Sequence, residues 1–213
     1  MTTSRLSLYN GALLEIGERD LESLTENREP RRLLDRAWDN GLVDYCLKQG
    51  QWTFAKRTKE LAPSTSVSPA FKYRNAFTKP TDFIRTRGLY SDEQMQVGLL
   101  HYGQEGNYFL ADEEALYLDY VSNDDSYGGN PANWPADFVR AVEVYLASRI
   151  VKKLTQSADD EVALFKRAHY LMEKAASADA MEGPAKFLPA GGWVKARRGG
   201  GGGDRGNRGS LVG

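Results

Sequence analysis

The chain has 213 residues, of which 41% are hydrophobic and 11% aromatic, so global disorder is excluded and one domain, or one domain with a sizeable insertion, is expected. The net charge of −1 is unevenly distributed, because residues 183–213 carry six basic residues and one aspartate, a charge of +5, which leaves about −6 for residues 1–182. The single cysteine, Cys46, excludes an internal disulfide framework and fits a reducing compartment. We expect no signal peptide and no membrane-spanning segment, since no apolar run is long enough.

The first expected helix begins near Thr3 or Ser4, either of which can cap it, and ends at Gly17. Its apolar residues recur at three- and four-residue steps and therefore lie on one face. They are Leu6, Tyr9, Leu13 and Ile16.

A second helix is expected to begin around Pro30, which is tolerated in a first helical turn, and to stop at Gly50. Its apolar row consists of Leu34, Trp38, Leu42 and Tyr45, with Leu33, Ala37 and Cys46 beside it. The position of Cys46 in this stripe predicts a buried thiol rather than a reactive one. The tripeptide Trp52-Thr53-Phe54 follows directly.

From residue 52 to 122 the hydrophobic period changes from that of a helix to that of a strand. Strand-like patterns occupy residues 71–77, 82–90, 96–103, 107–112 and 115–122, separated by glycines and by the acidic turn Asp112-Glu113-Glu114. Residues 108–118, "YFLADEEALYL", are typical of a β-hairpin. A small antiparallel sheet is therefore expected.

Two more helices follow the loop at residues 122–133. One begins at Pro135 and is apolar nearly all around, which is typical of a helix covered on most sides by its neighbours. The other runs from about Asp159 to Ala180, with a packing row of Val162, Phe165, Ala168 or His169, and Met172.

These elements predict an α+β fold that is mainly α, with a four-helix bundle and a small antiparallel β-sheet or hairpin insertion. Residues 1–51 and 133–182 would form the bundle, residues 52–132 the β-rich insertion, and residues 183–213 a flexible Gly/Arg-rich arm. The expected bundle core is Leu13, Ile16, Leu34, Trp38, Leu42, Trp52, Phe54, Phe138, Val142, Leu146, Ile150, Phe165 and Met172.

No catalytic, metal-binding or cofactor-binding motif is found in the sequence, so an enzyme is not expected. The two histidines, His101 and His169, have no cysteine or carboxylate at metal-ligand spacing. Glycines 98, 103 and 106 match neither a dinucleotide fingerprint nor a P-loop, and the run at residues 199–203 lacks the following Lys-Ser or Lys-Thr. Asp119, Asn123, Asp124 and Asp125 fail the calcium-loop spacing and favour a turn.

The C-terminal arm has three interpretations. Its Arg-Gly runs are typical of segments that contact nucleic-acid phosphates. Its apolar residues could instead dock on a partner, because exposed aromatic residues are favoured at interfaces. A solvated terminus without a partner is the third interpretation. The docking residues would be Phe187, Leu188, Trp193, Val194, Arg197 and Arg198.

The ordered blocks resemble a known family. "LSLYNGALLEIGE", then "RRLL" and "WTFAKR", is similar to head-to-tail connectors of tailed phages, and most similar to the tail tubular protein A family of podovirus-like tails. "KYRNAFTKPTDFIR" resembles the segment that follows in that family, where a Tyr precedes Pro-x-Asp. "NWPADFVRAVEVYLASRIVKKLTQ" resembles its late helix, and together these blocks span about residues 4–180.

This resemblance implies a structural virion protein, not an enzyme, without a cofactor and not in a membrane. Such connectors assemble as a ring, usually of about twelve copies, between the portal protein and the tail or nozzle protein. DNA would pass through the central channel without sequence-specific contact, since an acidic body repels it. The expected location is the neck or tail of the virion, and the host cytoplasm during assembly. The alternatives are a nucleic-acid-binding accessory protein that acts through its tail, and an enzyme with an unrecognised site in the β insertion.

Overall fold

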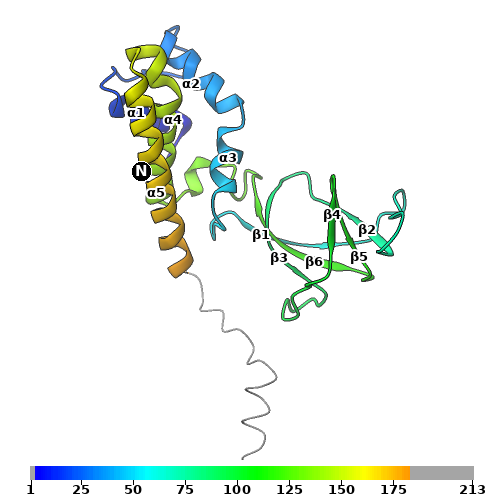
Figure 1. Cartoon of the computed structure of the whole chain (residues 1–213). Helices are drawn as coiled ribbons and strands as arrows, with labels where there is room; N and C mark the ends of the chain where they lie inside the picture. The colour runs from blue at the N-terminus through cyan, green and yellow to red at the C-terminus, as the bar shows by residue number, and fades with distance from the viewer. Residues whose placement is uncertain (1–2, 183–213) are drawn as a thin grey trace, which may run out of the picture. The chain divides into compact units, whose positions relative to one another are not determined.

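The structure is a computed structural model that describes residues 3–182 (Figure 1). Over these residues the fold is α+β, as the sequence predicts. The helices are α1 (Arg5–Glu15), α2 (Glu29–Asp39), α3 (Leu42–Lys48), the short 3-10 helix η1 (Pro131–Asn133), α4 (Ala136–Thr155) and α5 (Ala158–Glu182). The strands are β1 (Lys56–Leu61), β2 (Asn75–Thr78), β3 (Phe83–Tyr90), β4 (Gly103–Glu105), β5 (Tyr108–Ala111) and β6 (Leu116–Ser122).

The first helix begins as its sequence predicts. The Ser4 hydroxyl accepts a hydrogen bond from the Ser7 amide at 3.2 Å, and the Ser7 hydroxyl accepts one from the Ser4 amide at 2.8 Å. This reciprocal cap satisfies two amides that a helix start would leave unpaired. The chain leaves the helix through Gly17, whose φ of +74° is the left-handed conformation that glycine adopts without strain.

The single helix expected between Pro30 and Gly50 is two helices in the structure. The chain breaks after Asn40, at Gly41, whose φ of +79° cannot continue a right-handed helix. Periodicity alone missed this break, because the apolar spacing continues through it. The consequence is that Trp38 and Tyr45, expected in one row, lie on different helices.

Helix α4 contacts α1, α2 and α5, which explains why its sequence is apolar nearly all around. Most of the expected core is buried in the cluster that these helices share: Leu13, Leu34, Leu42, Trp52, Phe138, Val142, Leu146, Ile150 and Met172. Ile16, Trp38 and Phe54 are partly buried against it. Phe165 differs from expectation, since 40% of it is exposed and it lies outside the cluster.

The strands form two three-stranded antiparallel sheets, ordered β1-β6-β3 and β2-β5-β4. The hairpin expected at residues 108–118 is therefore wrong, because β5 and β6 belong to different sheets. Strand β6 instead lies between β3 and β1. The charged sequence of β1, KRTKEL, gives no strand signal. The strand expected from Phe71 starts only at Asn75, and residues 96–102 form no strand, only a bridge at Gly98.

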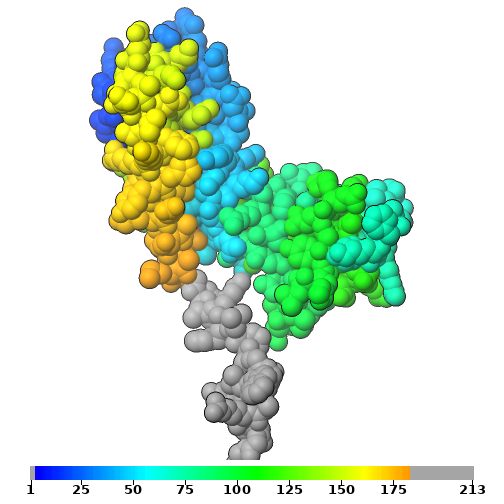
Figure 2. Space-filling view, viewed as in Figure 1, coloured from blue at the N-terminus to red at the C-terminus, as the bar shows by residue number. Residues whose placement is uncertain are grey.

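The two faces of β6 pack against different cores. Leu118 and Tyr120 point into a cluster that both sheets share, whereas Val121 belongs to the cluster of the helical part. Between them, Asp119 is 2% exposed and lies 3.5 Å from the Arg87 guanidinium. Because both faces are covered, nearly every residue of this strand is buried, and the sheets are fixed to the helical part (Figure 2).

The segment Trp52-Thr53-Phe54 joins the helical part to the sheets and is held from three sides. The Trp52 indole N–H donates to the Leu47 carbonyl at 3.0 Å. The Asp179 carboxylate accepts from the amide and the hydroxyl of Thr53, at 2.8 Å and 2.6 Å. Arg87 donates to the Trp52 carbonyl at 2.7 Å. These hydrogen bonds satisfy backbone groups that would otherwise lack partners and fix the path of the chain at this junction.

Candidate interaction surface

The described residues hold no cluster of side chains suited to a metal ion. Residues 3–182 contain no group of three or more His, Cys, Asp or Glu side chains that could hold a metal ion. Cys46 is buried, as expected, and burial raises the pKa of its thiol, so the nucleophilic thiolate is disfavoured. Asp124 does form a turn, accepting from the Ser126 amide at 2.9 Å, but Asp119 lies within β6 and not in that turn.

The nearest approach to an acid–hydroxyl pair is structural. Asp82 accepts hydrogen bonds from Ser122, from the Tyr120 hydroxyl at 3.0 Å and from Arg57 at 2.9 Å. Burial alone would raise the pKa of Asp82, but these three hydrogen bonds outweigh burial and hold it below its usual value. Ser122 itself is fully buried. A hydroxyl that no substrate can reach, beside a carboxylate already fully occupied, stabilises the sheet and offers no nucleophile.

A row of four rings crosses the outside of three helices. Tyr45 of α3 stacks on Tyr145 of α4 with ring centroids 4.9 Å apart and planes 13° apart. Phe165 of α5 lies 6.3 Å from Tyr145 and 4.5 Å from the His169 ring. The Tyr45 hydroxyl lies 3.4 Å from His169 Nε2, so the first and the last ring of the row are also neighbours. Tyr45 is 36% and Phe165 40% exposed, so the row is a surface feature.

Four cations lie beside this row: Arg36, Arg149, Lys153 and Lys166. Tyr145, Arg149 and Lys153 follow one another at four-residue steps, which places them on one face of α4. Arg36, Arg149 and Lys153 line a pocket of 280 Å³ with Tyr45 and Tyr145. Arg149 and Lys166 line a second pocket of 400 Å³ with Val162, Phe165 and one carboxylate, that of Glu161. We call the ring row and the four cations together the aromatic-basic face.

The four cations of the aromatic-basic face form no ion pair within the described part of the chain. Among the described residues, neither Arg36, Arg149, Lys153 nor Lys166 forms an ion pair, whereas their neighbour Lys152 pairs with Glu161 at 3.3 Å. Burial raises the pKa of Tyr145 to about 12, so its hydroxyl stays neutral and contributes no opposing charge at physiological pH. The face therefore offers apolar ring edges next to unpaired positive charge.

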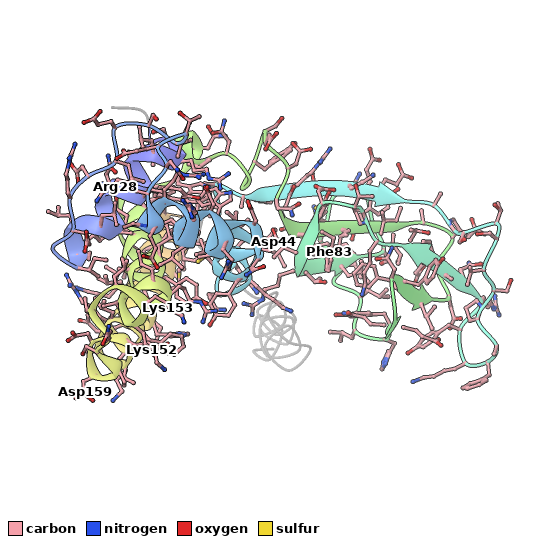
Figure 3. All side chains as sticks on the ribbon, turned by 90° about the horizontal axis from the view of Figure 1, so that it is seen from above. Arg28, Asp44, Phe83, Lys152, Lys153 and Asp159 are labelled. Carbon is pink, nitrogen blue, oxygen red and sulfur yellow. The ribbon has the colours of Figure 1, made fainter. Side chains whose placement is uncertain are left out.

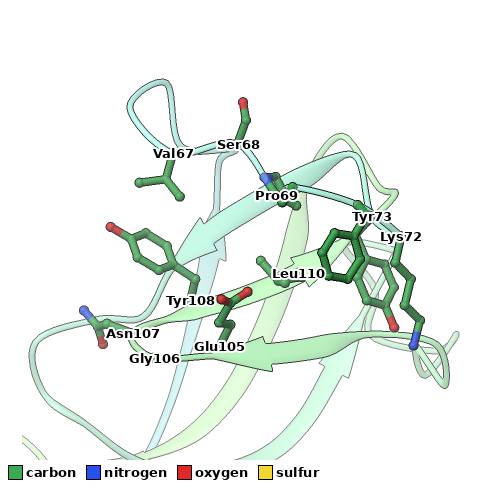
Figure 4. Close-up of a pocket in the computed structure, with 12 residues that line it drawn as sticks. Val67, Ser68, Pro69, Lys72, Tyr73, Glu105, Gly106, Asn107, Tyr108 and Leu110 are labelled. Carbon is green, nitrogen blue, oxygen red and sulfur yellow. The ribbon is translucent and has the colours of Figure 1, made fainter.

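A separate pocket of 480 Å³ lies between residues 67–73 and the turn of the β4–β5 hairpin (Figure 4). Its lining is mainly apolar and includes Pro69, Tyr73, Tyr108 and Leu110. Phe71 is 84% exposed at its rim, where the sequence predicted a half-buried strand residue. Lys72 and Glu105 are its charged groups, and the lining holds no set of groups suited to catalysis.

The predicted docking residues Phe187, Leu188, Trp193, Val194, Arg197 and Arg198 lie outside the described residues. The aromatic-basic face was not predicted from the sequence. Two signals pointed to it: the basic residues at 149 and 153, and the row that contains Phe165 and His169, which was assigned to packing. Periodicity identifies an apolar row but not whether a neighbour covers it.

No helix among residues 3–182 has both the length and the apolar character required to cross a bilayer. A scan against protein-family models and a search of the curated proteins return no match to this chain.

Proposed function

We propose that this protein is a structural head-to-tail connector of a tailed phage, forming a ring between portal and tail around a DNA channel. The observation that carries the proposal is the aromatic-basic face. It is a surface of exposed rings and cations without an ion pair, a composition that suits contact with a protein. Nothing in it activates a nucleophile or holds a metal.

In this proposal α1, α2, α4 and α5 act as the four-helix bundle that forms the wall of the ring, with α3 turning the chain toward the sheets. The hydrogen-bonded junction at Trp52 supports this role, because a subunit of a ring needs its helical part and its sheets held together. The order of the packing blocks, similar to that of tail tubular protein A, supports the same assignment.

The charge distribution is compatible with a channel for DNA. Residues 1–182 carry a net charge of about −6, so their surface as a whole repels phosphates and lets DNA slide. The portal, the tail or nozzle protein and neighbouring copies would be the partners, with the C-terminal arm as a docking segment. The protein would be found in the virion neck, and in the host cytoplasm before assembly.

The test is to mix the full-length protein with its cognate portal and to image the product by electron microscopy. A ring added to one end of the portal is expected. A control portal from an unrelated phage should receive no ring. A protein that stays monomeric and never adds to its portal would contradict the proposal.

The Arg-Gly runs of the tail favour a second candidate, a nucleic-acid-binding accessory protein. Binding of a short DNA duplex that weakens steeply with salt and is abolished by truncation after Gly183 would support it. Absence of binding at low salt would remove it.

A further inference from the structure

The partner of the aromatic-basic face follows from how its rings are arranged. Nucleic-acid bases bind proteins by stacking on open ring faces. Here one face of Tyr45 and one face of Tyr145 cover each other, and Phe165 lies against Tyr145, so fewer open ring faces remain for bases. Unpaired guanidinium and ammonium groups beside apolar edges fit carboxylates and an aliphatic side chain, which is the chemistry of an acidic protein segment.

The same chain carries a segment of that chemistry. Residues 18–29, which we call the acidic linker, comprise the end of the α1–α2 connection and Glu29, the first residue of α2; they hold five carboxylates and two arginines, a net charge of −3. Asp20 and Glu29 form no ion pair with any described residue, and Glu22 pairs only with the exposed Arg19. Leu24 is 37% exposed between these acids. The linker thus presents carboxylates and one leucine together.

The linker is held in place. The Asn10 side chain accepts from the Leu21 amide at 2.9 Å and donates to the Leu21 carbonyl at 3.1 Å. Leu21 is buried, and Arg28 donates to the Asp20 carbonyl at 3.2 Å. A segment fixed in this way loses little conformational entropy on binding, which favours its use as a contact.

The linker and the aromatic-basic face are on different parts of the helical surface. Figure 3 labels Arg28 of the linker well apart from Lys152 and Lys153 at the end of α4. The face is built by α2, α3, α4 and α5, whereas the linker connects α1 to α2. Two complementary surfaces at different places on one molecule generate a head-to-tail contact that can close into a ring.

We propose that the aromatic-basic face binds the acidic linker, residues 18–29, of a second copy of this chain. This inference rests on the proposed ring and names the contact between its subunits. Arg149 and Lys153 pair with carboxylates of the neighbour's linker, and Leu24 of that neighbour packs against Phe165 and Val162.

Charge reversal tests the contact in the full-length protein. Self-association is measured by sedimentation velocity over a range of concentrations, and ring formation on the portal by electron microscopy. Arg149→Glu with Lys153→Glu should weaken self-association at least ~100-fold, since like charges then face each other. Asp20→Lys with Glu22→Lys should weaken it similarly. A mixture of the two variants should associate again, because each supplies the surface that matches the other.

The matched control is Lys59→Glu with Lys174→Glu, which changes the net charge equally on exposed residues outside the face. It should associate as the unmodified protein does. Circular dichroism melting of each variant checks that the fold survives.

If rings form on the portal but tolerate Arg149→Glu with Lys153→Glu, this inference fails and the connector function stands. If only the face variant matters and the linker variant does not, the linker is not the partner and the inference fails. Loss of DNA-duplex binding in the face variant, with self-association intact, would assign the face to nucleic acid. An unmodified protein that never self-associates, alone or on the portal, overturns both proposals.

Discussion

Two rows of aromatic rings cross the helical part, and they differ in what surrounds them. The inner row runs from Tyr9 through Trp38, Trp134 and Phe138 to Trp52, with neighbouring centroids 4.7–6.4 Å apart. The outer row, from Tyr45 to His169, has similar centroid distances of 4.5–6.3 Å but reaches solvent. Ring-to-ring geometry alone therefore does not distinguish a core from a surface.

The polar groups distinguish the two rows. In the inner row three polar groups have partners in the same chain: the Trp134 indole donates to the Gly128 carbonyl at 2.8 Å, the Trp52 indole to the Leu47 carbonyl at 3.0 Å, and the Tyr9 hydroxyl to Asp35 at 3.0 Å. In the outer row the flanking cations have none among the described residues. A row whose polar neighbours are satisfied is complete, whereas a row flanked by unpaired charge is suited to a partner.

Replacing Phe138, the most connected ring of the inner row, should have the largest effect. Phe138→Ala removes contacts to Trp134, Trp52 and Phe54 and leaves a cavity, so the free energy of unfolding should fall by about 3–5 kcal/mol. Chemical denaturation with urea measures this. Phe71→Ala, at an exposed ring, should change it by less than ~0.5 kcal/mol. A comparably small loss for Phe138→Ala would show that the inner row is not core.

Phe165→Ala sharpens the comparison, because the same substitution is made in the outer row. We expect a loss of about 1 kcal/mol in the free energy of unfolding, since Phe165 is only partly buried. Self-association should weaken more than stability does. Urea denaturation and sedimentation velocity measured on one preparation separate the two effects. A loss of stability as large as that for Phe138→Ala would show that Phe165 is a core residue.

The smallest effect concerns the pH dependence of Tyr145. An unfolded tyrosine titrates near ~10, whereas in the folded protein burial raises the pKa of Tyr145 to about 12. The stabilisation from its neutral form is therefore complete below about pH 10 and is lost as the pH rises through about 12. Tyr145→Phe should melt almost like the unmodified protein at pH 7 and lose less stability between pH 10 and 12. Thermal melts of both proteins between pH 10 and 12 test this. If their melting temperatures fall equally with pH, the result contradicts the burial of this hydroxyl.

The elements that sequence reasoning located correctly are those specified by local chemistry. Ser4 caps α1, Pro135 precedes α4, and the all-round apolar pattern of α4 reflects its three helical neighbours. The strands β3, β5 and β6 also follow from their alternating or continuous apolar patterns. Strand pairing did not follow, because β6 takes as its partner a strand of charged sequence far back in the chain.

The candidate site could be predicted only in part, for a similar reason. The sequence shows that Phe165 and His169 share a helical row and that Arg149 and Lys153 share another. It does not show that α3, displaced by the break at Gly41, brings Tyr45 onto Tyr145. The stacked pair, and with it the surface, exists only once three helices are in place.

The sequence by itself determined where α1, α2 and α4 start and which apolar rows the helices carry, because caps and periodicity act over a few residues. Only the tertiary structure decided which rows are covered. Covering a row requires another segment of the chain at the right distance, and local patterns carry no information on that distance. Trp52, whose surroundings are supplied by Leu47, Phe138 and Arg87, is therefore core, whereas Phe165 lies at the surface.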